Sequence, residues 1–379
     1  MFFSIYFACN HIYILGKRGK MKTLSLCMIV KNEEKTLARV LENAHIYADE
    51  IIVVDTGSTD STKKIAQKFT TKVYDYKWKD DFACARNYSF DKAQSRYIIW
   101  LDGDDFLPDS TAEKIKEWKF ERGEEDVLMC TYATAYDENL KPTYQFLRER
   151  IVKNIPLLRW HDRVHEVIVP CGKVVNRPDI VIYHGKQKPH TNRNLKIYQA
   201  MIKEGEEFSP RSLFYYAREL YYNGHFKKAI HTLKDFLKKE DAFVENKIEA
   251  CLILCYCYEN VHDNEKALDS LFESFRFSYP RGEVLYNIGR IFMNEKKFKQ
   301  ASYWFEKAIE NGNELESGAF VDKLKTTLFP ALDLVVCYYN LGDLNRAQHF
   351  HEVTKGLSPN DESVLHNEQF FASLCKNKN

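Results

Sequence analysis

Two aspartates separated by one glycine follow an apolar stretch in the first half of the chain. Residues 98–101 are Ile-Ile-Trp-Leu, and Asp102, Gly103 and Asp104 come directly after them. Carboxylates at positions i and i+2 can present oxygens to one hard divalent cation, Mg²⁺ or Mn²⁺, while phosphate oxygens fill other positions. When two aspartates with this spacing occur without other motifs, they more often form an acidic turn after a strand. The metal-binding interpretation therefore depends on the motifs that accompany it.

Polar residues also close two earlier apolar runs. Asp55 ends the run Ile-Ile-Val-Val, and an aspartate at a strand end can accept hydrogen bonds from a ribose or a base edge. Val30, Asn32 and Glu33 end the first run, where backbone groups and the Glu33 carboxylate could frame a nucleobase. Two simpler interpretations stay open, because Asp55 equally suits a turn and Asn32 with Glu33 equally suits the start of a helix.

A cationic residue stands between these motifs. Arg86 lies in the segment Trp-Lys-Asp-Asp-Phe-Ala-Cys-Ala-Arg-Asn, residues 78–87. Its planar guanidinium could supply a fixed cationic fork near a diphosphate, with Asp81 holding it in place. An Arg–Asp pair with a purely structural role is the alternative.

Strands and helices alternate up to about residue 190, and they decide where these side chains meet. The runs 24–30, 50–55, 72–76 and 97–101 have the length and composition of strands. The βαβα order predicts a Rossmann-like, mostly parallel sheet with helices on both faces. In such sheets ligands bind beyond the carboxyl ends of the strands, where Asp55 and Asp102 both stand.

After about residue 208 the pattern becomes purely helical and repeats itself. Four alanines occupy one recurring position in apolar helical stripes, and they are 38, 34 and 46 residues apart. This spacing is near the 34-residue period of tetratricopeptide repeats. A glycine stands five residues before the first and the last alanine, where the turn between two helices belongs. The four alanines are Ala229, Ala267, Ala301 and Ala347.

The two periodicities divide the chain. We predict an α/β domain over residues 21–207 and an all-α, tetratricopeptide-like domain over residues 208–379. Residues 1–20 are interpreted as a dispensable extension, a non-native start. Their apolar stretch is shorter than the roughly 20 residues that a membrane helix needs, and they make a poor secretory signal. We therefore expect no membrane partner.

The order of the motifs resembles glycosyltransferase family 2, a large family with the GT-A fold. That family shows a strand ending near Asn-Glu, a second ending in V-D-x-x-S-x-D, and a later D-x-D; residues 30–33, 54–60 and 102–104 match these in order. The resemblance implies a UDP-activated sugar donor. It implies that Asp55 contacts the uridine, Asp102 the ribose or the metal, and Asp104 the metal.

Further segments narrow the subgroup. The W-x-x-D-F-x-x-A-R-N and V-H-E segments at 78–87 and 164–166, followed by repeats, resemble bacterial family 2 enzymes with tetratricopeptide tails. Among these are the peptide S-glycosyltransferases that modify bacteriocins. The resemblance implies inverting transfer of a hexose to a cysteine (S-linked) or serine (O-linked) of a precursor peptide. UDP-glucose is the first choice of donor. We expect the repeats to hold the peptide.

The same resemblance assigns chemistry to three further residues. An inverting transfer needs a base that takes the acceptor proton, and Glu166 is the first choice and His165 the second. A His–Glu pair with a purely structural role is the alternative. His184 ends an apolar strand and would complete the metal shell, as a downstream histidine does in several GT-A enzymes; a core histidine is the alternative.

The composition excludes some classes of partner. The 55 basic and 54 acidic residues leave a formal charge of +1, so no overall field attracts nucleic acid or an anionic membrane. Cys251, Cys255 and Cys257 lack zinc or redox spacing, and we predict reduced core residues of a cytoplasmic protein. A homodimer, a glycan or lipid-linked acceptor and a non-catalytic repeat adaptor stay open as alternatives.

Overall fold

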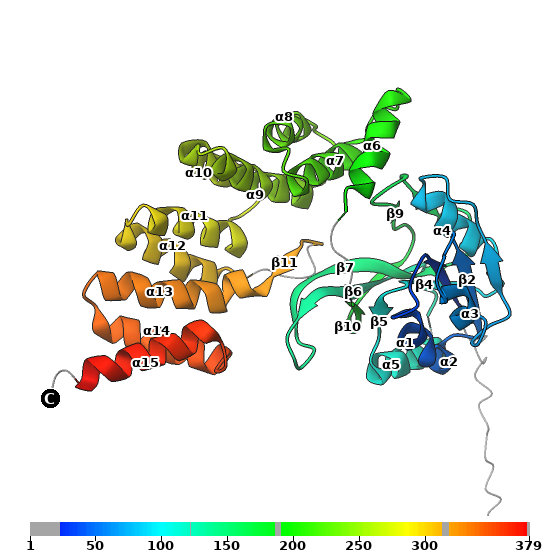
Figure 1. Cartoon of the computed structure of the whole chain (residues 1–379), viewed down its shortest axis with the longest axis horizontal. Coiled ribbons are helices and arrows are strands. Elements are labelled where there is room, and N and C mark those ends of the chain that lie inside the picture. The colour runs from blue at the N-terminus through cyan, green and yellow to red at the C-terminus, as the bar shows by residue number, and fades with distance from the viewer. Residues whose placement is uncertain (1–22, 122, 186–190, 313–317, 377–379) are drawn as a thin grey trace, which may run out of the picture.

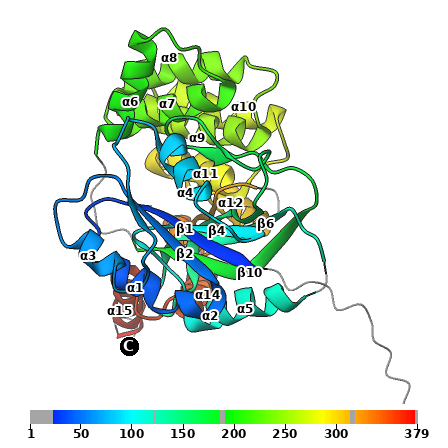
Figure 2. The same cartoon turned by 90° about the vertical axis from the view of Figure 1, so that its right-hand side faces the viewer.

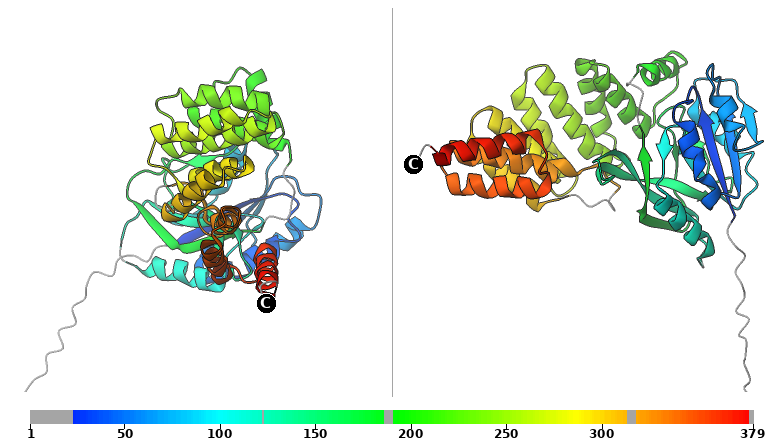
Figure 3. Two further views of the ribbon diagram at one scale, coloured as in Figure 1. Left: turned by 90° about the vertical axis from the view of Figure 1, so that its left-hand side faces the viewer. Right: turned by 60° about the horizontal axis from the view of Figure 1, so that its bottom comes forward.

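The computed structural model describes residues 23–121, 123–185, 191–312 and 318–376. The predicted N-terminal extension lies outside the described residues. Figure 1 shows a sheet flanked by helices, from which helical pairs lead away in an arc. Figure 2 shows helices α6 to α8 above the first strands, and the right view of Figure 3 agrees with Figure 1 in placing the last helix, α15 (Glu362–Lys376), far from those strands. Both predicted fold classes, an α/β part and an all-helical part, are confirmed.

The α/β part begins with the predicted alternation of strands and short helices. Its first strands, β1 and β2, have the predicted bounds. The elements of this part are β1 (Leu24–Val30), α1 (Leu37–Glu42), α2 (Ala44–Tyr47), β2 (Glu50–Asp55), α3 (Thr62–Ala66), β3 (Val73–Asp75), α4 (Phe82–Phe90), β4 (Tyr97–Asp102), β5 (Asp105–Phe106), α5 (Asp109–Phe120), β6 (Val127–Tyr136), β7 (Pro142–Lys153), β8 (Trp160–His161), β9 (Val167–Ile168) and β10 (Val174–His184).

The main sheet is parallel in its first half and mixed in its second. Its order is β3-β2-β1-β4-β7-β6-β10-β5, with β3, β2, β1 and β4 parallel. β6 and β7 form a hairpin and are therefore antiparallel, and β7 also runs antiparallel to β4. β10 is parallel to β6, and β5 is antiparallel to β10. The sheet is therefore less uniformly parallel than the first strands suggested.

Apolar side chains cover both faces of the central strands. Met28 and Val53 belong to the core on one face, while Cys27 and Ile52, their sequence neighbours, belong to the core on the other. Since successive side chains of a strand point to opposite faces, a strand buried on both sides must be apolar at most positions. The apolar runs, broken within β1 by the buried Ser25, and the polar residues that end them follow from this packing.

The helical part consists of hairpins that repeat one turn geometry. Each predicted alanine is fully buried in the second helix of a hairpin. Five residues before each alanine the backbone is left-handed, at Gly224, His262, Lys296 and Gly342, with φ between 60° and 78°. The helices are α6 (Arg193–Lys203), α7 (Pro210–Tyr222), α8 (Phe226–Leu237), α9 (Val244–Asn260), α10 (Asn264–Glu273), η1 (Ser274–Arg276), α11 (Gly282–Asn294), α12 (Phe298–Glu310), η3 (Lys323–Thr326), α13 (Leu328–Asn340), α14 (Leu344–Leu357) and α15.

The longest interval between two alanines contains a strand that joins the two parts. β11 (Val321–Asp322) lies between α12 and α13 and pairs antiparallel with β7, with Val321 opposite Gln145. Figure 1 shows this strand extending from the arc toward the sheet. The irregular spacing of the repeats is thus the insertion that attaches them to β7. Among the described helices, none combines the length and hydropathy that crossing a membrane requires.

Candidate active site

The carboxyl ends of β1 and β4 open onto a cavity of about 630 Å³. The turn between β8 and β9 forms a second wall, and the starts of α6 and α7 form a third. This volume is within the range of small-molecule sites. Ten of the twelve residues predicted for the site line it: Val30, Asn32, Glu33, Arg86, Asp102, Gly103, Asp104, His165, Glu166 and His184. Asp55 and Asp81 do not.

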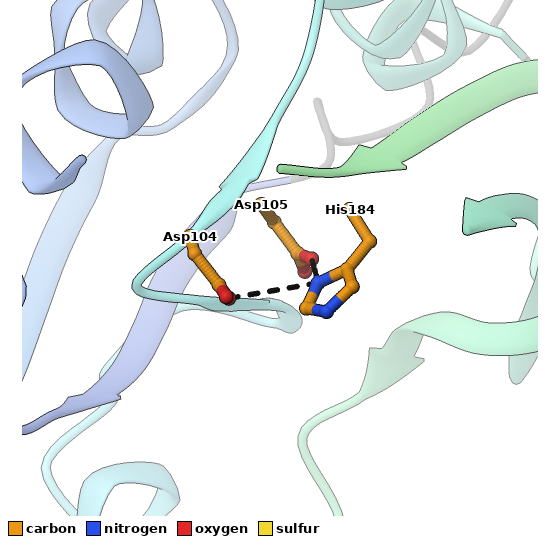
Figure 4. A group of neighbouring side chains, drawn as sticks. All are labelled: Asp104, Asp105 and His184. Atoms are coloured by element: carbon orange, nitrogen blue, oxygen red, sulfur yellow. Dashed lines mark ion pairs between the residues drawn. The ribbon is translucent and has the colours of Figure 1, made fainter. Parts of the chain in front are cut away.

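Asp104, Asp105 and His184 form a group whose ligand atoms lie within 4.8 Å of one another (Figure 4). His184 Nδ1 lies 3.6 Å from Asp104 Oδ1 and 3.5 Å from Asp105 Oδ1. The sheet brings them together, because the last residue of β10, His184, is registered opposite Asp105 of β5. The metal assignment of Asp104 and His184 therefore gains a geometric basis.

Asp102 was predicted to contact the ribose or the metal, but the structure places it outside this group and puts Asp105 there instead. Asp105 is fully buried, and its Oδ2 accepts hydrogen bonds from the Asp102 backbone N–H at 3.0 Å and from Arg150 Nη1 at 2.9 Å. Its Oδ1 accepts one from Tyr132 at 2.9 Å. Asp105 therefore orients the turn and faces His184. Its position next to the D-x-D was the signal in the sequence.

The charges of this group suit a divalent cation. Burial raises the pKa of Asp104 to about 6, and Asp102, Asp105 and Glu33 add to the rise, although His184 opposes it. Burial by itself lowers the pKa of His184, but the carboxylates of Asp105 and Asp104 outweigh it and raise the pKa overall. A bound cation would relieve the repulsion among these carboxylates, whose hard oxygens suit Mg²⁺ or Mn²⁺.

Arg86 binds two carboxylates of the site rather than Asp81. Its Nη2 donates to Asp102 Oδ1 at 2.5 Å and its Nε donates to Glu166 Oε1 at 2.7 Å. The guanidinium lies over the rings of Trp100 and Trp160, 4.9 and 4.8 Å from their centroids. Arg86 thus connects the end of β4 to the β8–β9 turn, and two of its donor nitrogens are already engaged.

The predicted Arg86–Asp81 pair is therefore wrong. Asp81 precedes α4, and its Oδ1 accepts a hydrogen bond from Cys84 N at 2.8 Å, as an N-terminal helix cap does. Asp55 likewise holds its own turn, since its Oδ1 accepts from Gly57 N and Ser58 N, both at 2.8 Å. Its Oδ2 is buried without a hydrogen-bond partner among the described residues.

The residues after β1 are held against the neighbouring turns. Asn32 has a left-handed backbone, φ 55°, and its Oδ1 accepts a hydrogen bond from Thr59 N at 2.8 Å. Glu33 packs on Gly103, where a Cβ would lie 2.6 Å from Glu33 Cγ. Only glycine fits between the two aspartates at this distance. Thr56, which follows Asp55, lines the cavity in its place and donates to Val30 O at 3.1 Å.

Sequence reasoning missed the residues that the helical part contributes. Arg193 and Asn194 of α6 and Arg211 and Tyr215 of α7 line the cavity. The Arg193 guanidinium lies over the Phe82 ring, 4.7 Å from its centroid, and forms no ion pair with a described carboxylate. No local motif marks these positions, because they reach the site only through the packing of α6 and α7 on the β8–β9 turn.

Comparisons with known proteins show which family the chain resembles. Residues 25–181 match the Glycosyl transferase family 2 model. The chain is 29% identical over 258 residues to the SPbeta prophage-derived glycosyltransferase SunS of Bacillus subtilis, covering 63% of the chain and 59% of SunS. It is 35% identical over 178 residues to the "putative teichuronic acid biosynthesis glycosyltransferase TuaG" of the same species, covering 45% of the chain and 67% of TuaG.

A third relative is named for its repeats and not for a glycosyltransferase activity. A TPR repeat-containing protein of Synechococcus elongatus is 33% identical over 148 residues, which cover 39% of this chain and 36% of that protein. The chain belongs to glycosyl transferase family 2. It spans about three-fifths of the length of SunS.

Proposed function

We propose that the protein is an inverting, metal-dependent hexosyltransferase that uses a UDP-hexose, UDP-glucose in the first instance, and glycosylates a cysteine or serine of a peptide, a bacteriocin precursor. The observation that carries the proposal is that Asp104 and His184 lie together and line the cavity beside the ends of β1 and β4. Family membership and the match to SunS support the class of reaction.

The donor would lie along the strand ends. Val30, Asn32, Glu33 and Thr56 line the end of the cavity that we assign to the nucleoside, with Asp102 at the ribose. Asp104 and His184 would hold Mg²⁺ or Mn²⁺, which stabilises negative charge on the departing diphosphate. Arg193 would pair with the same diphosphate, because a guanidinium binds phosphate oxygens through charge-assisted hydrogen bonds.

The acceptor would enter from the side of the helical part. That wall carries Arg211 and Tyr215, and it adjoins the β8–β9 turn with the base candidates His165 and Glu166. A cysteine acceptor needs modest activation, since a thiol with a pKa of about 8.5 is a few per cent ionised at neutral pH. The arc of repeats begins at this wall and offers a long surface for an extended peptide.

The donor half is tested by release of UDP from UDP-glucose. We expect release that requires Mn²⁺ or Mg²⁺, stops with a chelator and is lost in Asp104→Ala. Asp91→Ala is the control, because Asp91 is exposed at the end of α4 and does not line the cavity. Metal-independent release, or full activity of Asp104→Ala, would contradict the proposal.

The acceptor half is tested by mass spectrometry on cysteine-containing peptides encoded near the gene. We expect a mass increase of one or more hexoses that disappears when the acceptor cysteine is replaced by alanine. An increase that moves to a serine would make the linkage O-linked. Transfer to a glycan or lipid-linked acceptor, with none to peptides, would exclude the peptide assignment and leave the donor half intact.

A further inference from the structure

The His165 ring is held by the helical part of the chain. His165 lies in the turn between β8 and β9, and its Nε2 is 2.8 Å from Glu219 Oε1 of α7. The ring stacks on Tyr215, with centroids 4.4 Å apart and planes inclined by 16°. Arg211 Nη2 donates to the His165 carbonyl at 3.2 Å. Three residues of α7 therefore fix one residue of the cavity wall.

The backbone of His165 indicates that this placement is imposed. Its φ is 53°, in the left-handed region, which costs a residue with a Cβ roughly 1–2 kcal/mol. Such conformations persist where the surroundings determine them, and they gather at functional sites. Here the surroundings are the ring and backbone contacts to α7.

Glu219 acts as a hydrogen-bond acceptor in this arrangement. It is 1% exposed, and its Oε1 also accepts from Asn194 Nδ2 at 3.1 Å. With this Oε1 as the acceptor, Nε2 of His165 carries the shared proton, and Nδ1 of the neutral ring keeps its lone pair. No described residue forms a hydrogen bond with Nδ1, and the ring lines the cavity.

The charges around the ring favour its neutral form. Burial lowers the pKa of His165 below its ordinary value, and Arg218 adds to this effect. The hydrogen bond and charge of Glu219 act in the opposite direction, as does the charge of Glu166, without reversing the shift. Glu166 itself already accepts a hydrogen bond from Arg86.

We propose that Glu219 is a positioning residue, which holds His165 by Nε2–H so that Nδ1 takes the proton of the attacking nucleophile. This inference rests on the proposed function. The O–H or S–H proton of the nucleophile passes to Nδ1, and the electron pair forms the bond to the anomeric carbon. The bond from that carbon to the β-phosphate oxygen breaks, and UDP leaves with its electron pair. Glu219 then faces an imidazolium, which its charge stabilises.

The test is Glu219→Gln in the full chain, assayed by metal-dependent release of UDP from UDP-glucose with water as the nucleophile. Glutamine keeps an acceptor for Nε2–H but removes the charge. We expect kcat to fall about 10- to 100-fold while UDP affinity stays within about twofold. Glu283→Gln is the matched control, because Glu283 is also buried in the helical part, accepts a backbone N–H and lies outside the cavity.

The pH profile separates positioning from a merely structural role. Since Glu219 raises the pKa of His165, its loss lowers that pKa, and the midpoint of the acidic limb of kcat/KM should move to lower pH. The double variant Glu219→Gln/His165→Asn should have nearly the same kcat as His165→Asn alone, because the two residues act as one unit. An unshifted midpoint, independent losses in the double variant, or an unimpaired Glu219→Gln would overturn the inference.

Two further results are possible: Glu219→Gln does not fold, or the wild-type chain releases no UDP. If Glu219→Gln does not fold, which its loss of UDP affinity would show, the variant His165→Asn tests the inference instead. Its amide can still donate a hydrogen bond to Glu219. If His165→Asn loses turnover and keeps normal UDP affinity, the result supports His165 as the base. If it keeps turnover, the inference is overturned. If the wild-type chain releases no UDP, the proposed function itself fails, whereas normal turnover of both wild type and Glu219→Gln refutes this inference alone.

Discussion

Replacing Arg86 by glutamine should destabilise the protein and should not act on the diphosphate. The side chain is 8% exposed and its two partners, Asp102 and Glu166, are 29% and 12% exposed. Removing one member of a buried pair typically costs about 3–5 kcal/mol, because the other charge is left without a partner. Water in the cavity reaches Asp102, so we take the lower value, about 3 kcal/mol. For a unit of 150–250 residues this lowers Tm by about 6–12 °C.

The loss should depend on pH in a defined direction. Burial pushes the pKa of Asp102 upward, but Arg86 and Arg150 outweigh it and hold the pKa well below its ordinary value. A depressed carboxylate pKa contributes stability that is present above the ordinary pKa, about 3.9, and is lost as the pH falls through the folded value. The Arg86→Gln deficit should therefore be full at pH 7 and shrink below about pH 4.

Thermal unfolding followed by circular dichroism measures the deficit, with Arg96→Gln as the control. Arg96 pairs with Glu124 near the surface, where the Arg96 side chain is 33% exposed and the Glu124 side chain 72%, and its loss should leave Tm unchanged. Calorimetry with UDP and uridine then separates the two roles of Arg86. A Tm within 2 °C of wild type, or a loss of UDP affinity with uridine affinity intact, would refute the structural role and restore the diphosphate contact.

Four further substitutions test other parts of the structure. Arg193→Gln should weaken UDP binding about 10- to 100-fold and uridine binding hardly at all, as measured by calorimetry, with Arg177→Gln as a control away from the cavity. Asp105→Asn should lower Tm by removing the partner of a buried arginine, whereas Asp104→Asn should spare Tm and abolish metal-dependent UDP release. Burial raises the pKa of Glu283 to about 7, so wild-type stability should fall as the pH rises from about 4.5 to 7. Glu283→Gln should therefore exceed wild type by up to about 3 kcal/mol at pH 8 and equal it near pH 4 in denaturant titrations.

The local patterns predicted the elements that carry their own signal. Strands buried on both faces are apolar at most positions, so β1 and β2 and the polar residues that end them were readable from composition. The helical hairpins were readable because each packs a small residue at one position. The turns between them were half visible, since Gly224 and Gly342 mark two of the four left-handed positions while His262 and Lys296 adopt the same φ without a glycine.

Partnerships between distant residues could not be predicted in this way. The segment around Arg86 places Asp81 five residues away, yet folding brings Asp102 and Glu166 to its guanidinium, because β4 and the β8–β9 turn meet beside α4. The hydrogen bond between His165 and Glu219 spans 54 residues and depends on how α7 packs. Short apolar and turn motifs report local burial and backbone geometry. Which charges share a cavity depends on long-range packing, which no single segment encodes.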